Sequence, residues 1–376
     1  MPAALAANMT MAVRDVAPPG RIEKTSRVMP VGLQKNIMRR TMPSIKYCWI
    51  FITDRCQLDC DYCFFSSKTR RQDLSLAQAR RLLSILPKGS KTEFVISGGE
   101  PLLRWDFVKT LVRDIKKIRP KSSIVLQSNM LLLTDERMRF LRRHNISLEP
   151  GIDGNPESTA RHRKGTSAQN YRLICTNIKK ALRLGIEVFP TMTVHPQETR
   201  YMARNFGFLS SLGVSRIDVH PAFLAAWDAA SAKDFIDNYR HLAALSCARK
   251  RVLCPCYSRP MSYGHDLVVL PQGDVLANWT FMAFPKVIRD RFFILKLGAD
   301  GITYNEAVYQ GLLAHYRALF KNRTVSYREF SNYSAALAMR LWKRARPKAG
   351  FRRYRDICRT VKNIDKTFLM TPRHAK

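Results

Sequence analysis

The stretch Cys56-Gln57-Leu58-Asp59-Cys60-Asp61-Tyr62-Cys63 places three cysteines within eight residues. It directly follows an apolar run, Cys48-Trp49-Ile50-Phe51-Ile52, which predicts a buried β-strand. In parallel α/β folds, ligands and reactive groups gather at the carboxyl ends of the strands. Spacings of three and two intervening residues can bring three thiolates around one centre. We therefore interpret Cys56, Cys60 and Cys63 as metal or redox ligands.

From Ile45 onward, apolar β-rich runs alternate with helix-length segments. The expected strands are 45–53, 92–97, 123–127, 146–152, 186–194 and 214–220, and the expected helices are 72–86, 105–118, 135–144, 168–184 and 199–212. Strands separated by helix-length connections favour parallel βαβ units with right-handed crossovers. We predict an α/β chain: a partial (β/α)6 barrel of parallel strands with a smaller C-terminal α+β extension. A doubly wound open sheet is the competing architecture.

Changes in composition divide the chain into four expected regions. They are a flexible N-terminal segment (1–44), the α/β core (45–228), an extension with further helices (229–345) and a basic C-terminal tail (346–376). Within the extension we expect a helix over 229–248, a β-hairpin over 267–276 that turns at Gln272-Gly273, and helical structure over 303–345.

Composition places the chain among globular proteins of a reducing compartment. Hydrophobic residues make up 46% of its 376 residues, and no apolar stretch reaches the ~18 residues that a membrane span needs. The segment Met1–Met11 has no basic flank of the kind that a secretory signal carries. Nine cysteines, unevenly spread, are too sparse for a secreted disulfide scaffold. We expect a cytoplasmic protein without membrane contact.

The formal net charge of +35 is large, and the basic excess is locally strong near the end, over 340–376. Such a field attracts nucleic acid, anionic membrane, or an acidic or phosphorylated substrate, without selecting among them. A solvated surface with basic tails is the alternative explanation, and the sequence favours neither.

The number of cysteines in the cluster helps to distinguish the kinds of metal site. A structural zinc site uses four ligands, usually as paired Cys-x-x-Cys knuckles, and no second knuckle follows. A cubane iron–sulfur cluster is also normally held by four cysteines. Three ligands leave one iron uncapped, and a substrate or cofactor can bind at that corner.

At this point the sequence resembles a known family. Cys56-x-x-x-Cys60-x-x-Cys63, with the aromatic Tyr62, resembles the signature of the radical S-adenosylmethionine (radical SAM) enzymes. In these enzymes three cysteines hold a [4Fe–4S] cluster, and SAM chelates the fourth iron. Gly98-Gly99-Glu100-Pro101, after the second strand, resembles the family motif that contacts the amino group of SAM. Glycines allow close backbone approach, and a carboxylate pairs with an ammonium group.

Two further segments match the family in order along the chain. Gln127-Ser128-Asn129 resembles a polar triplet near SAM, which makes Ser128 and Asn129 candidate cofactor contacts. Gly151-Ile152-Asp153-Gly154, followed by Arg163, resembles the subgroup with a SPASM or twitch extension, which is peptide-modifying and sulfatase-maturase-like. There the arginine reaches the carboxylate of SAM. Thr159-Ala160 stands where the subgroup usually has His-Asp, but Arg163 stays in register.

The resemblance implies an enzyme that reductively cleaves SAM to a 5′-deoxyadenosyl radical, which abstracts hydrogen from a substrate carbon. It implies one [4Fe–4S] cluster, SAM, and an external electron donor of flavodoxin or ferredoxin type. The outcome is an oxidation, an epimerisation or another radical-based modification, and no catalytic acid, base or hydrogen donor can be nominated. We rank a peptide substrate first, a small molecule (sugar, nucleoside or amino acid) second, and nucleic acid last among the enzymes. A structural iron–sulfur or zinc protein that binds nucleic acid would need no Gly98–Pro101 motif.

The extension resembles the start of a SPASM or twitch domain, with Pro271-Gln272-Gly273 as its turn. Cys254 or Cys256 could supply the upstream ligand, but Asn278 occupies the later position where that subgroup has cysteine. An auxiliary cluster needs about four soft ligands. We therefore expect that the extension has lost its cluster, which favours redox-neutral outcomes.

Iron quantification tests this expectation. Anaerobically reconstituted protein should contain about four iron atoms per chain, because only one cysteine motif has cluster spacing. A value of about eight would show a second cluster.

Overall fold

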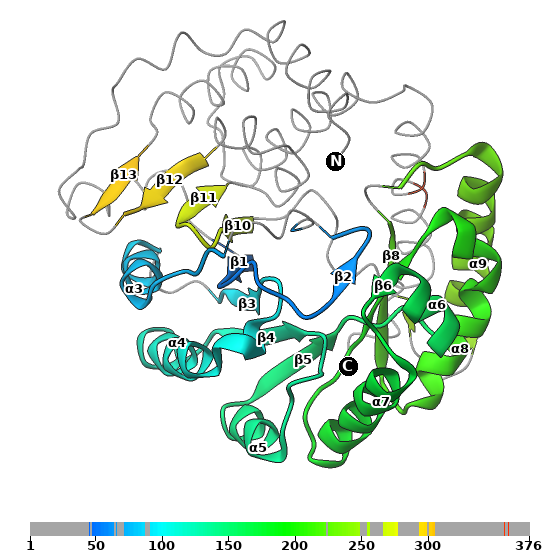
Figure 1. Cartoon of the computed structure of the whole chain (residues 1–376), viewed down its shortest axis with the longest axis horizontal. Coiled ribbons are helices and arrows are strands. Elements are labelled where there is room, and N and C mark those ends of the chain that lie inside the picture. Colours follow the sequence, from blue (N-terminus) through cyan, green and yellow to red (C-terminus); the bar gives the residue numbers. More distant parts are fainter. Residues whose placement is uncertain are drawn as a thin grey trace, which may run out of the picture. The chain divides into compact units, whose positions relative to one another are not determined.

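The computed structural model of the chain (Figure 1) describes residues 45, 47–63, 65, 71–86, 91–222, 225–248, 254–255, 266–276, 293–298, 301–304, 357 and 360. The predicted N-terminal segment 1–44 lies outside these residues, as do most of the predicted helical segment 303–345 and of the basic tail.

The described residues divide into two compact units. The first comprises the described parts of Met1–Arg55, Lys68–Ile124 and Met261–Pro347. The second comprises the described parts of Cys56–Ser67, Val125–Pro260 and Lys348–Lys376.

The first unit contains a mixed sheet with helices α3 (Leu76–Ile85) and α4 (Trp105–Ile118). Its strands follow the order β13 (Ile302–Tyr304), β12 (Phe293–Leu297), β11 (Asp274–Leu276), β10 (Asp266–Val269), β1 (Tyr47–Phe51) and β3 (Glu93–Ser97). Strand β1 pairs in parallel with both β3 and β10, and the pairs from β10 to β13 are antiparallel. Ile50, Phe94 and Val268 are fully buried, as expected for apolar strands covered on both faces.

The hairpin expected at Gln272-Gly273 is confirmed. Strands β10 and β11 pair with Val268 opposite Leu276, and Gly273 has a φ of 89°, a backbone conformation that glycine adopts readily. The Gln78 side chain, in the first turn of α3, donates to the carbonyl oxygen of Leu297 at 2.6 Å. The strands of the extension thus continue the sheet beside β1 (Figure 1). The domain boundary near residue 228 stays a prediction.

The second unit contains β5 (Ile146–Pro150), β7 (Thr191–Val194), β8 (Arg216–Pro221), β9 (Cys254–Pro255) and most of β4 (Ser123–Ser128). Strand β7 pairs in parallel with β8, and β8 with β9; β5 joins the segment before and at β7 through parallel bridges. Its helices are α5 (Asp135–Arg143), α6 (Pro156–His162), α7 (Ala168–Arg183), α8 (Met202–Ser211) and α9 (Ala229–Ala248). The expected mixed α/β class with parallel strands is confirmed.

Several local elements differ from the sequence-based expectation. Helix α6 was not expected, although Asn155 caps it and Pro156 occupies its first turn, which are ordinary helix-start signals. The predicted helix 199–212 is a 3-10 turn, Pro196–Tyr201, followed by α8. Strands β2 (Asp59–Cys60) and β6 (Arg163–Lys164) form a ribbon of two residues each, too short to leave a hydrophobic pattern.

Among the described residues, no helix combines the length and the apolar character that crossing a membrane requires.

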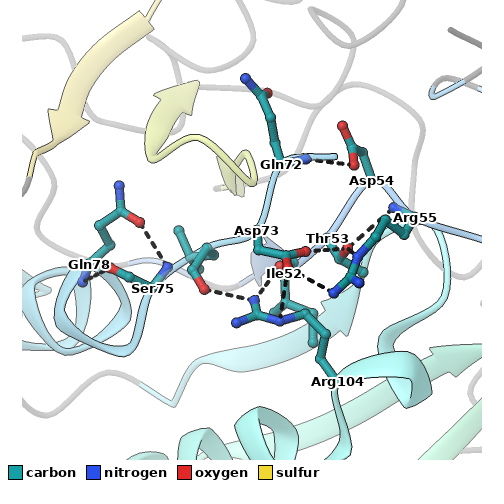
Figure 2. A network of polar contacts seen from close by, with 10 residues as sticks. Ile52, Thr53, Asp54, Arg55, Gln72, Asp73, Ser75, Gln78 and Arg104 are labelled. Atoms are coloured by element: carbon teal, nitrogen blue, oxygen red, sulfur yellow. Dashed lines mark hydrogen bonds and ion pairs between the residues drawn. The ribbon is translucent and has the colours of Figure 1, made fainter. Parts of the chain in front are cut away.

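A polar network in the first unit is centred on Arg104, the last residue of the 3-10 helix Pro101–Arg104 (Figure 2). The Arg104 Nη1 atom donates to the carbonyl oxygens of Ile52 and Leu74, both at 2.7 Å. Asp73 accepts from the Thr53 hydroxyl at 2.6 Å and from Arg55 Nη2 at 2.8 Å, and lies 3.7 Å from Arg104 Nε. Burial lowers the pKa of Arg104, and Asp73 partly offsets this. The network fixes residues 52–55, which lead directly into Cys56.

Replacing Arg104 by methionine should lower the free energy of unfolding by about 2 kcal/mol, because two backbone carbonyls lose a charged donor. Urea denaturation measures this. The matched control is Arg80→Met, since the Arg80 side chain is 57% exposed and makes one ion pair, with Asp114. That variant should change stability by less than about 1 kcal/mol. Equal losses in both variants would contradict the structural role of Arg104.

Candidate functional site

The three cysteines predicted as ligands lie on one loop of the second unit. Cys56, Cys60 and Cys63 are all present as thiols and are half-buried. The backbone amide of Leu58 donates to Cys56 Sγ at 3.4 Å, and that of Phe65 donates to Cys63 Sγ at the same distance. Amide donors directed at sulfur stabilise thiolate charge and help to set the potential of an iron–sulfur cluster.

Three cysteines are a donor set of the kind that iron–sulfur clusters use. Within the part of the chain that the structure describes, no group of three His, Cys, Asp or Glu side chains converges as a single metal ion requires. A cubane does not need such convergence, because each cysteine binds a separate iron. Three soft sulfur ligands on one loop therefore suit a [4Fe–4S] cluster with three protein ligands.

The surroundings of Cys60 shift the pKa of its thiol. Burial raises its pKa, the nearby Arg163 guanidinium lowers it, and the carboxylates of Asp153 and Asp61 raise it further. The net shift is upward, so the thiol form dominates at neutral pH in the absence of metal. A metal that binds this thiol would have to displace its proton, so binding there would favour higher pH.

Backbone and side-chain bonds fix the middle of the loop to the end of α6. Cys60 pairs with Arg163 in the β2–β6 ribbon, and the Asp61 amide donates to the carbonyl oxygen of His162 at 3.1 Å. The Asp61 carboxylate also lies 3.0 Å from His162 Nδ1. His162 is buried and stacks on His195, with ring centroids 4.3 Å apart. Burial, and then the neighbouring His162, lower the pKa of His195.

Sequence reasoning missed His162 and His195. The only available signal for His162 was its position immediately before Arg163 at the end of an unrecognised helix. His195 directly follows β7, so a polar residue at a strand end was the only cue.

Asp153 and Arg163, predicted from the Asp-Gly…Arg segment, form a buried ion pair in the second unit. Arg163 donates through Nε and Nη2 to the two carboxylate oxygens of Asp153, both at 3.0 Å. Tyr62 donates its hydroxyl to Asp153, and its ring lies under the guanidinium of Arg163. Burial alone would lower the pKa of Arg163, but Asp153 holds it well above its usual value. Burial raises the pKa of Tyr62, which keeps its phenol protonated.

Asn129 lies beside the first cysteine of the loop. Its side-chain amide donates to the Gln57 side chain at 3.1 Å and lies 3.8 Å from Cys56 Sγ. Its carbonyl oxygen accepts from the Leu131 amide, and the Ser128 hydroxyl accepts from the Met130 amide, both at 3.0 Å. The predicted pair Ser128 and Asn129 thus shapes the turn after β4, and Gln57 is a contact that the sequence did not suggest.

The Gly98–Pro101 turn belongs to the first unit. The Gly99 amide donates to the Thr53 carbonyl oxygen and the Glu100 amide to that of Arg55, both at 2.8 Å. A Cβ atom at Gly99 would collide with backbone atoms of Arg55 and Asp54, which explains the glycine. Glu100 is fully buried and caps the following 3-10 helix, with its carboxylate accepting from the Leu102 amide at 2.9 Å.

The predicted site residues therefore fall into two groups. Gly98, Gly99, Glu100 and Pro101 lie in the first unit, packed on residues 53–55. The second unit brings together the remaining candidates: Cys56, Cys60, Cys63, Tyr62, Ser128, Asn129, Asp153 and Arg163. Of the downstream candidates, Cys254 lies in β9, and Cys256, Asn278 and Cys358 lie outside the described residues. The single-cluster expectation stays a prediction.

Residues 50–205 match the sequence pattern of the Radical SAM superfamily, over the segment that carries all four motifs. This segment is a radical SAM domain. The curated relatives of the domain include GTP 3′,8-cyclase of Alkaliphilus metalliredigens, 31% identical over 38% of this chain and 45% of that protein. A serine-type anaerobic sulfatase-maturating enzyme of Klebsiella pneumoniae is 26% identical over 44% of this chain and 45% of that protein. The chain thus spans less than half the length of these relatives.

Solved structures share the fold of this chain over a region longer than the radical SAM segment. Native anSMEcpe with bound AdoMet superposes with a TM-score of 0.62 at 14% identity, covering 86% of this chain and 98% of that one. SuiB of Streptococcus suis, bound to the precursor peptide SuiA, gives a TM-score of 0.54 at 12% identity, covering 88% and 87%. At these identities the likeness concerns the fold, and it supports the expected partial barrel.

The Gly99 turn of the radical SAM domain generates a stability prediction. Gly99→Ala should lower the free energy of unfolding by about 1–3 kcal/mol, because the new methyl group meets rigid backbone. Gly207→Ala is the matched control, since a Cβ atom there has nothing within 4 Å and the residue lies inside α8. It should stabilise the protein by about 0.5–1 kcal/mol. Chemical denaturation compares them, and a neutral Gly99→Ala would contradict the close approach.

Proposed function

We propose that this chain is a radical SAM enzyme that cleaves SAM at one [4Fe–4S] cluster held by Cys56, Cys60 and Cys63. The observation that carries the proposal is the cysteine loop itself. It presents three thiols, with backbone amides directed at the first and last sulfur, and no fourth cysteine of the described residues is on it. A corner without a protein ligand is what a chelating cofactor needs.

When bound and reduced, the cluster supplies the electron that splits SAM into methionine and a 5′-deoxyadenosyl radical, which abstracts a substrate hydrogen. The protein's part is to bind, orient and shield. By the sequence resemblance, Glu100 pairs with the ammonium group of SAM and Arg163 with its carboxylate. The bond from the Leu102 amide leaves Glu100 able to accept others, because a carboxylate has about four acceptor positions. Tyr62, Ser128 and Asn129 are further proposed contacts beside the loop.

A peptide is the substrate class that we propose first. Structures of the same fold have been solved with peptides bound: anSMEcpe with the Cp18Cys peptide, at a TM-score of 0.61 and 15% identity, and SuiB with its precursor peptide SuiA. A chain of net charge +35 would attract an acidic peptide. The outcome that we propose is redox-neutral, in line with a single cluster.

A small anionic molecule is the second candidate. The sequence relatives at about 30% identity include several GTP 3′,8-cyclases, from Alkaliphilus metalliredigens and Peptoclostridium acidaminophilum among others. A nucleoside triphosphate would also be attracted by the positive charge. The proposed electron donor in either case is a flavodoxin or ferredoxin, and the proposed location is the cytoplasm.

Cleavage of SAM tests the proposed function. Wild-type protein, reconstituted with iron and sulfide and reduced with dithionite, should convert SAM into 5′-deoxyadenosine. Cys56→Ala, Cys60→Ala and Cys63→Ala should each fall to the background rate and lose the brown absorbance, because a two-cysteine site holds a cubane poorly. Cys175→Ala is the control, since this thiol belongs to α7 and not to the loop, and the variant should keep wild-type iron and turnover. Wild-type cleavage in any loop variant would contradict the ligand assignment.

The same assay separates the two substrate classes. Deuterated acidic peptides and deuterated GTP are incubated separately with reduced enzyme and SAM. Deuterium should appear in 5′-deoxyadenosine with a peptide; transfer from GTP alone would overturn the peptide proposal in favour of the small-molecule one.

A further inference from the structure

Asp153 has more partners than an ordinary buried ion pair requires. Its carboxylate accepts two bonds from Arg163, one from the Tyr62 hydroxyl and one from the backbone amide of Thr193 at 3.0 Å. The side chain is only 3% exposed. A carboxylate has about four acceptor positions, so these four bonds saturate it. Thr193 lies in β7, so one of the four anchors is sheet backbone.

The partners of Asp153 come from separate parts of the site. Tyr62 lies between the second and third cysteines of the loop. Arg163 pairs its backbone with Cys60 in the β2–β6 ribbon. One carboxylate, fixed to β7, therefore holds the cluster loop both directly, through Tyr62, and indirectly, through Arg163.

The orientation of Arg163 is equally specific. Asp153 uses the Nε and Nη2 atoms of the guanidinium, which has five N–H donors in a fixed plane. The Nη1 atom lies over Gly151, where an added Cβ atom would come within 2.5 Å of it. Glycine at this position thus makes room for the guanidinium, and most closely for Nη1, which Asp153 does not use. An ion pair with no further role would need neither a glycine at position 151 nor the hydrogen bond from Tyr62.

We propose that Asp153 is a positioning residue that acts on two functions at once: it fixes the cluster loop through Tyr62, and it turns the Nη1 edge of Arg163 toward the carboxylate of SAM. This inference rests on the proposed function. The absence of a side chain at Gly151 leaves the space in which Arg163 takes this orientation. Substitution can separate the two actions. Tyr62→Phe removes the hydroxyl bond to Asp153 and keeps the ring beside Arg163, whereas a methyl group at Gly151 comes closest to the side chain of Arg163, whose backbone pairs with Cys60.

The separation defines the experiment. Each reconstituted variant is measured for the dissociation constant of SAM by calorimetry and for the rate at which a ferrous chelator removes iron. Asp153→Asn keeps the shape but loses the charge, and should worsen both quantities about tenfold, as expected for charge-assisted hydrogen bonds. Tyr62→Phe keeps the aromatic ring, which is the proposed SAM contact, and removes only the hydroxyl that donates to Asp153. It should therefore speed iron release about fivefold to tenfold and leave SAM affinity within about twofold. Gly151→Ala should weaken SAM binding about tenfold while iron release stays at the wild-type rate.

Tyr171→Phe is the control for general destabilisation. It removes a tyrosine hydroxyl that donates to the Gly154 carbonyl oxygen at 2.6 Å, one residue from Asp153. It should change neither the dissociation constant of SAM nor the rate of iron release by more than about twofold, whatever its effect on thermal stability. If Asp153→Asn does not fold, Tyr62→Phe and Gly151→Ala still decide the question, because they report the two actions separately.

The outcomes that overturn the proposals differ. A wild-type protein that takes up no iron and binds no SAM would overturn the proposed function and this role with it. A fully loaded wild type, with Tyr62→Phe and Gly151→Ala both behaving like Tyr171→Phe, would overturn the role of Asp153 alone.

Discussion

Among its described residues, the cysteine loop has only the two-residue strand β2 as regular structure of its own, so its geometry depends on bonds to neighbouring elements. In this protein those bonds come from a short stretch of the second unit. Cys60 pairs with Arg163, Asp61 with His162, and Tyr62 with Asp153. Cys60, Asp61 and Tyr62 thus each have a partner between residues 153 and 163. The short helix α6 (Pro156–His162) connects Asp153 to Arg163 and so helps to position all three partners.

The charged partners are buried, and burial decides their strength. An exposed ion pair contributes little, whereas a buried carboxylate that loses a partner leaves an expensive unpaired charge. Asp153 avoids this cost by filling all its acceptor positions. In the first unit, Arg104 has a comparable arrangement (Figure 2). Its guanidinium donates to two backbone carbonyl oxygens and lies near the carboxylate of Asp73. In each case an ionic group fixes backbone at a strand end; the Asp153 side chain is 3% exposed and that of Arg104 is 18% exposed.

The sequence alone was enough to predict several elements of the fold and most of the candidate site residues. Long apolar strands and amphipathic helices leave a strong period, so α4 was expected at the bounds observed and the hairpin at Gly273 was expected from its turn residues. Glycines and cysteines at strand ends pointed to the loop and to the Gly98–Pro101 turn. The sequence also selected Asp153 and Arg163, but as separate cofactor contacts. Their mutual pairing depends on tertiary geometry, as do the His162–His195 stack and the tie from Asn129 to Gln57. The β2–β6 ribbon could not be predicted from the sequence, because a strand of two residues is too short to show alternating hydrophobicity.

The central claim is that three cysteines hold a [4Fe–4S] cluster and leave one iron for SAM. Electron–nuclear double resonance of the reduced, reconstituted protein, mixed with SAM that carries a magnetic nitrogen isotope in its amino group, measures this directly. The account predicts a hyperfine coupling between that nitrogen and the cluster, together with a change of the electron paramagnetic resonance spectrum when SAM is added. A spectrum that SAM leaves unchanged, with no coupling to its nitrogen, would contradict it.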